Sequence, residues 1–198
     1  MKDITAVCVC SNTRNLIRDT VISFRQFHPD VKLIIVDGSD KTDLCYSYVQ
    51  GLQNKYTEVV LCGFNIGHGR GMDLGIKKVQ TKYGLIFDSD ILFLKSPVAE
   101  MLAMMNDSVF GVGHIGIHNK MKYLSPVFQL INVVIYKSLP PYVHHGAPCH
   151  KTMAEINKQG ITVLDFPIFP GYILHKGSGT RKDRLSKGKK DIEGKWEK

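Results

Sequence analysis

The stretch from residue 83 to residue 90, YGLIFDSD, decides the fold. Its first five residues form a short apolar run, which is typical of a buried strand. Asp88 and Asp90 follow directly, two positions apart, where the strand turns into a loop. Carboxylate oxygens at that spacing suit Mg²⁺ or Mn²⁺ shared with substrate phosphates. The stretch therefore predicts a strand with a metal site at its carboxyl end.

The chain before this stretch alternates apolar runs with helical patterns. Strands are expected at residues 4–10, 31–36 and 59–62, with amphipathic helices between them. A further helix is expected from residue 96, where serine and proline begin it. The order predicts an α/β fold with a mostly parallel sheet in a single domain. The second half is less regular, and we expect strands at 109–113, 129–136 and 161–166 and a helix at 151–158.

Polar residues follow the carboxyl ends of four of these strands, which is the edge where parallel α/β sheets bind ligands. They are SNT at 11–13, DGSD at 37–40, Asn65 and DSD at 88–90. The Asp37 carboxylate can accept hydrogen bonds from a base or a ribose, although DGSD is also ordinary turn chemistry. The coincidence of four such strand ends predicts a ligand site at this edge.

The glycine-rich segment at 65–75 lacks the dinucleotide-binding spacing, and two other common motifs of α/β enzymes are absent from the chain. The glycine-rich residues 65–75 do not follow the GxGxxG spacing, and they come after the third strand instead of the first. This spacing argues against a nicotinamide or flavin enzyme. The chain contains no GxxxxGK[ST] and no GxSxG, which excludes a P-loop and a nucleophile elbow.

The five cysteines and the hydropathy favour a cytoplasmic protein. An odd number of cysteines without regular spacing or a CxxC pair does not fit a secreted disulfide framework. The sequence predicts that Cys8, Cys10 and Cys62 are small buried hydrophobes. No window approaches 18 uninterrupted apolar residues, so no membrane-spanning segment is expected.

Positive charge gathers at the end of the chain. The net charge is +8, and residues 176–198 hold nine Lys or Arg against four Asp or Glu. Residues 182–198 are expected to form a basic tail that is either solvated or in contact with phosphates of a nucleic acid or an anionic membrane surface. Such a tail offers peripheral membrane contact without a transmembrane segment.

Histidines mark the second half. The segment HHGAPCH at 144–150 could hold a soft metal, supply a general base, or form a surface loop whose histidines merely titrate. His175 follows an apolar stretch and precedes residues 176–181, KGSGTR, a loop with donors for phosphate.

Taken together, these motifs resemble the GT-A glycosyltransferases, especially family 2. The small polar turn at 11–13, the Asp-Gly-Ser turn at 37–39, the Asn-x-Gly stretch from 65, the DSD motif at 88–90 and the late His175 follow one another in the family's order. The resemblance covers residues 3–97 well and 129–181 loosely. It implies a Rossmann-like GT-A domain over residues 1–181, with a nucleotide-sugar half at about 1–97 and an acceptor half at 98–181.

The resemblance implies a metal-dependent, hexosyltransferase-type enzyme with Mn²⁺ or Mg²⁺ and a nucleotide-sugar donor, a UDP-sugar being favoured. Asp37 would contact the base, and Asp88 the ribose or the metal. Asp90 and His175 would ligate the metal, and Arg181 would neutralise the leaving diphosphate. The implied donor-binding residues are Ser11, Asn12, Asp37, Asn65, Gly67, Asp88 and Arg181.

The chain departs from the family where inverting members carry an acidic pair. Counting back from Gly160 gives Pro148 and Cys149 instead of carboxylates. His145 is our candidate base, with Asp165 as another; a retaining enzyme would need none, and a binding-only relative also fits.

The acceptor is expected to be a glycan, a lipid-linked phosphate or modified DNA. Alternative functions are a nucleotidyltransferase-type enzyme, a tail-driven nucleic-acid or membrane-binding module, and a zinc enzyme built on 144–150.

Overall fold

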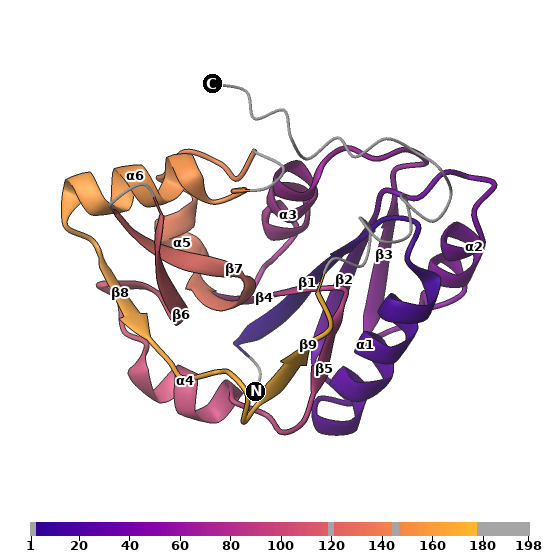
Figure 1. Cartoon of the computed structure of the whole chain (residues 1–198), viewed down its shortest axis with the longest axis horizontal. Helices are drawn as coiled ribbons and strands as arrows, with labels where there is room; N and C mark the ends of the chain where they lie inside the picture. The colour runs from indigo at the N-terminus through magenta and orange to yellow at the C-terminus, as the bar shows by residue number, and fades with distance from the viewer. Residues whose placement is uncertain (1–2, 119–120, 144–146, 178–198) are drawn as a thin grey trace.

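The computed structural model describes residues 3–118, 121–143 and 147–177. Seven strands form one sheet in the order β3-β2-β1-β4-β7-β6-β8, and β5 and β9 form a second, two-stranded sheet (Figure 1). The strands are β1 (Ile4–Cys10), β2 (Lys32–Asp37), β3 (Thr57–Leu61), β4 (Tyr83–Asp88), β5 (Ile91–Phe93), β6 (Val109–His118), β7 (Met121–Asn132), β8 (Thr162–Asp165) and β9 (Ile173–His175). The helices are α1 (Arg14–Phe27), α2 (Leu44–Gln50), α3 (His68–Lys77), α4 (Val98–Met104), α5 (Val133–Tyr136) and α6 (His150–Gln159).

Helices cover both faces of the large sheet. Buried side chains of α1, α2 and α4 share one apolar cluster with alternate residues of β1, β2 and β4, and those of α3, α5 and α6 share the other. Helix α3 lies close to β1. A Cβ placed on Gly75 would lie only 2.4 Å from Cγ1 of Val7. Glycine at this position lets α3 pack directly against β1.

The first four strands of the sheet are parallel, as expected. β1 pairs with β2 on one side and β4 on the other, and β2 pairs with β3. β7 runs antiparallel to both β4 and β6, and β6 pairs in parallel with β8. The sheet is therefore mostly parallel, and the predicted α/β class with a single domain is confirmed.

The expected strand at 129–136 is wrong in its second part. β7 ends at Asn132, whose Oδ1 accepts hydrogen bonds from the backbone N–H of Val134 at 3.0 Å and of Ile135 at 3.4 Å. This cap begins the short helix α5, and so the apolar residues after Asn132 are helical although they are β-branched or aromatic.

The two-stranded sheet was not predicted. β5 and β9 are three residues each, and β9 pairs antiparallel with β5 so that His175 lies opposite Ile91. This pairing places the last strand of the described chain beside the residues that follow the DSD motif. Among the described residues, no helix is long and apolar enough to cross a bilayer.

Candidate functional site

The polar strand ends meet at one edge of the sheet. In the pairing register Cys10 of β1 lies opposite Asp37 of β2, and Val9 lies opposite Asp88 of β4. The loops after these three strands therefore begin at the same level. The expectation that the carboxyl ends of the strands bring these polar segments together is thus met in the structure.

Asp37 is fully buried at the end of β2. Its Oδ1 accepts hydrogen bonds from the Ser39 hydroxyl, from the Ser39 backbone N–H at 3.1 Å and from the Cys10 thiol at 3.4 Å. Burial raises the pKa of Asp37, and these hydrogen bonds oppose that rise. Its other oxygen, Oδ2, is buried too and has no hydrogen-bond partner among the described residues, and so one acceptor of the carboxylate is unsatisfied.

Ser11 and Asn12 fix the loop that follows Asp37. The Ser11 hydroxyl donates to the Gly38 carbonyl at 3.0 Å. The backbone N–H of Asn12 donates to the Ser39 hydroxyl at 2.8 Å, and Asn12 Oδ1 accepts from the backbone N–H of Asp40 at 3.1 Å. Asn12 adopts φ 55°, a left-handed conformation that asparagine tolerates better than most residues. These two residues therefore shape the loop around the buried carboxylate.

Asn65 and Gly67 form the turn into α3. Asn65 Oδ1 accepts from the backbone N–H of Gly67 at 2.8 Å, and Gly67 has φ 87°. A Cβ on Gly38 would lie 3.3 Å from the Asn65 Cα, which shows how closely this turn passes the 37–40 loop. Nothing lies within 4 Å of the position of a Cβ on Gly67, so the turn leaves open space at the beginning of α3.

Asp88, Asp90 and His175 converge. Each offers a ligand atom, and these atoms lie within 4.8 Å of one another. Nε2 of His175 is 3.2 Å from Oδ1 of Asp90. Hydrogen bonding to Asp90 raises the pKa of His175, against the opposing effect of burial. Two carboxylates and one imidazole are a donor set that suits Mn²⁺ or Mg²⁺, so the residues present fit such an ion.

His68 joins this group, although the sequence analysis treated it only as part of a glycine-rich segment. Its Nε2 lies 3.1 Å from Oδ1 of Asp88. Burial favours the neutral imidazole, but the attraction to Asp88 outweighs it and raises the pKa of His68. The signal was its place as the first residue of α3, directly after the turn formed by Asn65 and Gly67.

Contacts from α1 and β9 hold the DSD turn in position. The Thr20 hydroxyl lies 2.8 Å from the Ser89 carbonyl and 2.7 Å from the Ile91 carbonyl. The backbone N–H of Lys176 donates to the Asp90 carbonyl at 2.8 Å, and its ammonium lies 2.9 Å from Oδ2 of Asp19. Because these contacts come from α1 and from the residue after β9, which also contact each other, the acidic pair has a supported geometry.

The position expected to hold a carboxylate base holds Cys149 at the beginning of α6. The side chain is fully buried, and burial raises the pKa of the thiol to about 12. Nε2 of Gln129 donates to its sulfur at 3.7 Å. Cys149 therefore stays protonated near neutral pH, and this position supplies no base. His145 and Arg181 lie outside the described residues.

Asp165 lies at the end of β8, on the far side of the same edge. Its Oδ1 accepts from the backbone N–H of Ile115 at 2.8 Å and is 4.0 Å from Nδ1 of His114. The Phe169 ring lies 5.8 Å from the His114 ring and 6.4 Å from that of His175. An exposed row of side chains therefore connects Asp165 with the residues around Asp90.

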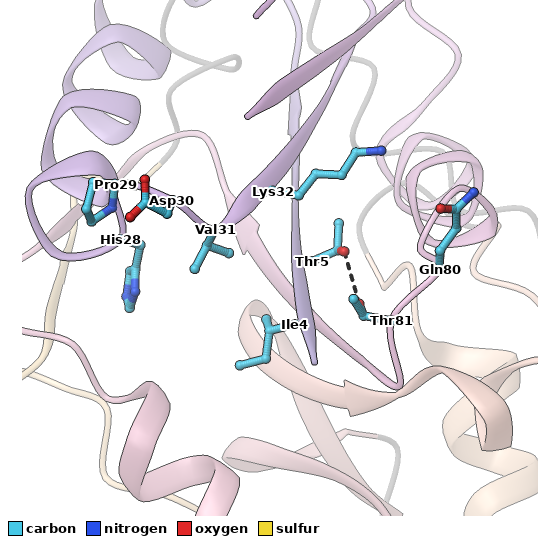
Figure 2. Close-up of a pocket in the computed structure, with 9 residues that line it drawn as sticks. All are labelled: Ile4, Thr5, His28, Pro29, Asp30, Val31, Lys32, Gln80 and Thr81. Atoms are coloured by element: carbon cyan, nitrogen blue, oxygen red, sulfur yellow. Dashed lines mark hydrogen bonds between the residues drawn. The ribbon is translucent and has the colours of Figure 1, made fainter. Parts of the chain in front are cut away.

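A separate pocket lies at the opposite, amino-terminal edge of the sheet (Figure 2). It has a volume of about 480 Å³ and is lined by the beginnings of β1 and β2 and by the segment before β4. The hydroxyls of Thr5 and Thr81 bond each other there at 3.0 Å. None of the candidate site residues that the structure describes lines this pocket.

The fold is that of the GT-A glycosyltransferases. A mannosyltransferase from Pyrobaculum calidifontis, PcManGT, solved with GDP-Man and Mn²⁺, has a TM-score of 0.69 at 15% identity, covering 83% of this chain and 55% of that one. TarS from S. aureus with UDP-GlcNAc has 0.65 at 14% identity, covering 90% and 60%. GalNAc-T7 with UDP, GalNAc and Mn²⁺ has 0.70 at 12% identity, covering 87% and 42%.

The chain belongs to glycosyl transferase family 2, which matches residues 5–155. This confirms the resemblance drawn from the sequence motifs. A human relative, Beta-1,4 N-acetylgalactosaminyltransferase 1, is 34% identical over 77 residues, which are 39% of this chain and 13% of that protein. The chain thus spans between about an eighth and three fifths of the length of these relatives.

Proposed function

We propose that this chain transfers a hexosyl unit from a nucleoside-diphosphate sugar, with Mn²⁺ or Mg²⁺ as cofactor. The observation that carries the proposal is the convergence of Asp88, Asp90 and His175 within 4.8 Å at the edge that also holds the buried Asp37 carboxylate. A sugar nucleotide needs both features, because its base is neutral and forms hydrogen bonds whereas its diphosphate is anionic. The family membership supports the same reaction class.

A UDP-sugar is the donor we favour. TarS was solved with UDP-GlcNAc and GalNAc-T7 with UDP, whereas PcManGT was solved with GDP-Man. In this chain the free Oδ2 of Asp37 offers an acceptor to a base N–H. Ser11, Asn12, Asn65 and Gly67 would border the nucleoside because they form the two loops beside that carboxylate.

The acidic pair would act on the diphosphate. Asp90 and His175 would hold the metal, with Asp88 on the metal or the ribose; when bound, the metal neutralises charge that develops on the departing diphosphate. His68 would keep Asp88 oriented through their contact at 3.1 Å. Arg181 is proposed to add positive charge from the segment that follows β9.

We propose a glycan, lipid-linked or modified-DNA acceptor at the row formed by Asp165, His114 and Phe169. His145 and Asp165 are the two candidates for the base that removes the acceptor proton. Asp165 is supported by its exposed carboxylate, which a backbone N–H orients at 2.8 Å. Membrane contact through residues 182–198 stays a prediction.

Calorimetric titration of UDP and then GDP, each with and without Mn²⁺, tests the proposal. Binding of one diphosphate that requires the metal would support a sugar-nucleotide site and identify the base. Absence of binding to both, at millimolar ligand, would overturn it. Turnover of the matching nucleotide sugar, measured as released diphosphate, then separates a transferase from a binding-only relative. Cleavage of a nucleoside triphosphate instead would indicate a nucleotidyltransferase.

A further inference from the structure

Two thiols lie directly beside the buried carboxylate of Asp37. Cys10 at the end of β1, Asp37 at the end of β2 and Cys45 in the first turn of α2 each place a ligand atom within 4.8 Å of the other two. All three are buried, at 3% exposure for Cys10 and 0% for Asp37 and Cys45. None of the motifs that point to sugar transfer requires either cysteine.

The cluster contains the chemistry of a thiophilic metal site. Thiolate sulfur and carboxylate oxygen are zinc ligands, at about 2.3 Å and about 2.1 Å from the metal. Tetrahedral geometry with those bond lengths places a sulfur and an oxygen about 3.6 Å apart. Sγ of Cys10 is 3.4 Å from Oδ1 of Asp37, so this edge of the tetrahedron is already close to its required length.

An unsatisfied buried atom indicates that the cluster is incomplete without a ligand. Oδ2 of Asp37 is buried and has no hydrogen-bond partner among the described residues. A divalent cation would replace the thiol protons and neutralise the buried negative charge.

We propose that Cys10, Cys45 and Asp37 form a site for a thiophilic divalent cation of the Zn²⁺ class. Binding releases the thiol protons, and the metal takes two sulfurs and one carboxylate oxygen, which leaves a position for water or a fourth ligand. It is distinct from the site at Asp90, whose oxygen and nitrogen donors suit harder ions. Since the same carboxylate is assigned to the base of the donor, occupancy would inhibit donor binding; that consequence alone rests on the proposed function.

Cobalt titration of the full chain under a non-thiol reductant tests the site, because Co²⁺ bound to thiolate absorbs in the near ultraviolet. We expect one equivalent of thiolate-bound cobalt, displaced by Zn²⁺. Cys45→Ala and Cys10→Ala should each lower the affinity for Co²⁺ at least tenfold. Cys62→Ser is the matched control, because Cys62 lies next to β3, outside the cluster, and it should bind as the parent does.

Two further measurements make the test decisive. Asp90→Asn should retain the cobalt absorption, which shows that the signal does not come from the Mn²⁺ site. Zn²⁺ should raise the melting temperature of the parent but not that of Cys45→Ala, provided that both are folded by circular dichroism. Absence of thiolate absorption in the parent, or cobalt absorption and affinity in both cysteine variants that match those of the parent, overturns the proposal. Neither outcome depends on sugar transfer, so the proposed function is judged separately.

Discussion

Each edge of the large sheet buries an ionisable side chain with a polar atom that lacks a hydrogen bond among the described residues: Asp37 at the carboxyl edge and His28 at the amino edge. Burial favours the neutral form of both, so it raises the pKa of Asp37 and lowers that of His28. By these criteria the two positions are equivalent.

Asp37 and His28 differ in the chemistry of the groups that surround them. Asp37 lies among thiol and hydroxyl groups and shares its edge with Asp88, Asp90 and His175. The ring of His28 instead packs 5.1 Å from that of Phe24 and 6.0 Å from that of Phe93, and its nitrogens are covered. Burial with a shifted pKa therefore does not identify a site by itself; the chemistry of the surrounding groups does. We therefore expect substitutions at the carboxyl edge to impair function and a substitution of His28 at the amino edge to change stability alone.

The largest effect is expected at Asp90. Asp90→Asn removes a charge from the proposed metal site, and we expect donor turnover to fall by about 10³-fold, since metal stabilisation of a leaving group contributes several kcal/mol. The melting temperature should stay within a few degrees. Steady-state release of diphosphate measures the effect. Asp107→Asn is the control, because that carboxylate is exposed and pairs with Lys82. Parental turnover in Asp90→Asn would remove the metal assignment.

The next effect concerns the amino edge and acts on stability alone. The pKa of His28 is lowered to about 4, mainly by burial and further by the charge of Arg25. As pH falls from 6.5 toward 4, the unfolded chain takes up a proton that the folded chain does not, so the free energy of unfolding decreases. The full difference is about 3 kcal/mol.

Urea unfolding between pH 7 and pH 4.5 measures this loss. His28→Leu removes the titration but keeps an apolar side chain against Phe24 and Phe93. The variant should lose less stability on acidification than the parent, while its donor binding at pH 7 remains unchanged. Parallel stability curves for the two proteins would show that His28 is not the neutral, buried group described above.

A third prediction tests the base contact. Asp37→Asn keeps the shape of the side chain but replaces an acceptor by an amide, and hydrogen bonds to charged groups contribute about 1.5–3 kcal/mol. We expect the dissociation constant of the preferred diphosphate to rise about 10- to 100-fold. Asp30→Asn, in the segment that lines the amino-edge pocket (Figure 2), provides the matched control and should bind as the parent does. Equal losses in both variants would contradict the contrast between the edges.

The carboxyl edge was largely predictable because its signals are local. A buried parallel strand is an apolar run, its end is marked by polar residues, and parallel pairing places those ends together. Asp37, Asp88 and Asp90 could therefore be assigned to one edge from the sequence alone. His68 was missed because its contact with Asp88 depends on how α3 enters against β1, which spacing alone does not encode.

The second half was predicted less well for three physical reasons. Pro126 and the polar residues around it interrupt the apolar pattern, so the first part of β7 was not expected. Asn132 ends that strand by capping α5, and a cap outweighs the strand preference of the four residues that follow. β9 is only three residues long, and it forms a strand because it pairs with β5, which is distant in the sequence. These features depend on tertiary context more than on local pattern.

The smallest effect is expected at Cys149, because we expect its thiol not to act as the general base. Cys149→Ser keeps a small polar group within reach of the Gln129 amide, which donates to the sulfur at 3.7 Å. Because burial raises the thiol pKa to about 12, the thiol does not accept a proton from an acceptor hydroxyl at pH 7. We therefore expect the transfer rate to change less than about twofold, since a general base contributes at least 10²-fold. Single-turnover transfer at saturating donor is the measurement. A hundredfold loss in Cys149→Ser, with a parental melting temperature, would make Cys149 part of the reaction and remove the need for a base at Asp165.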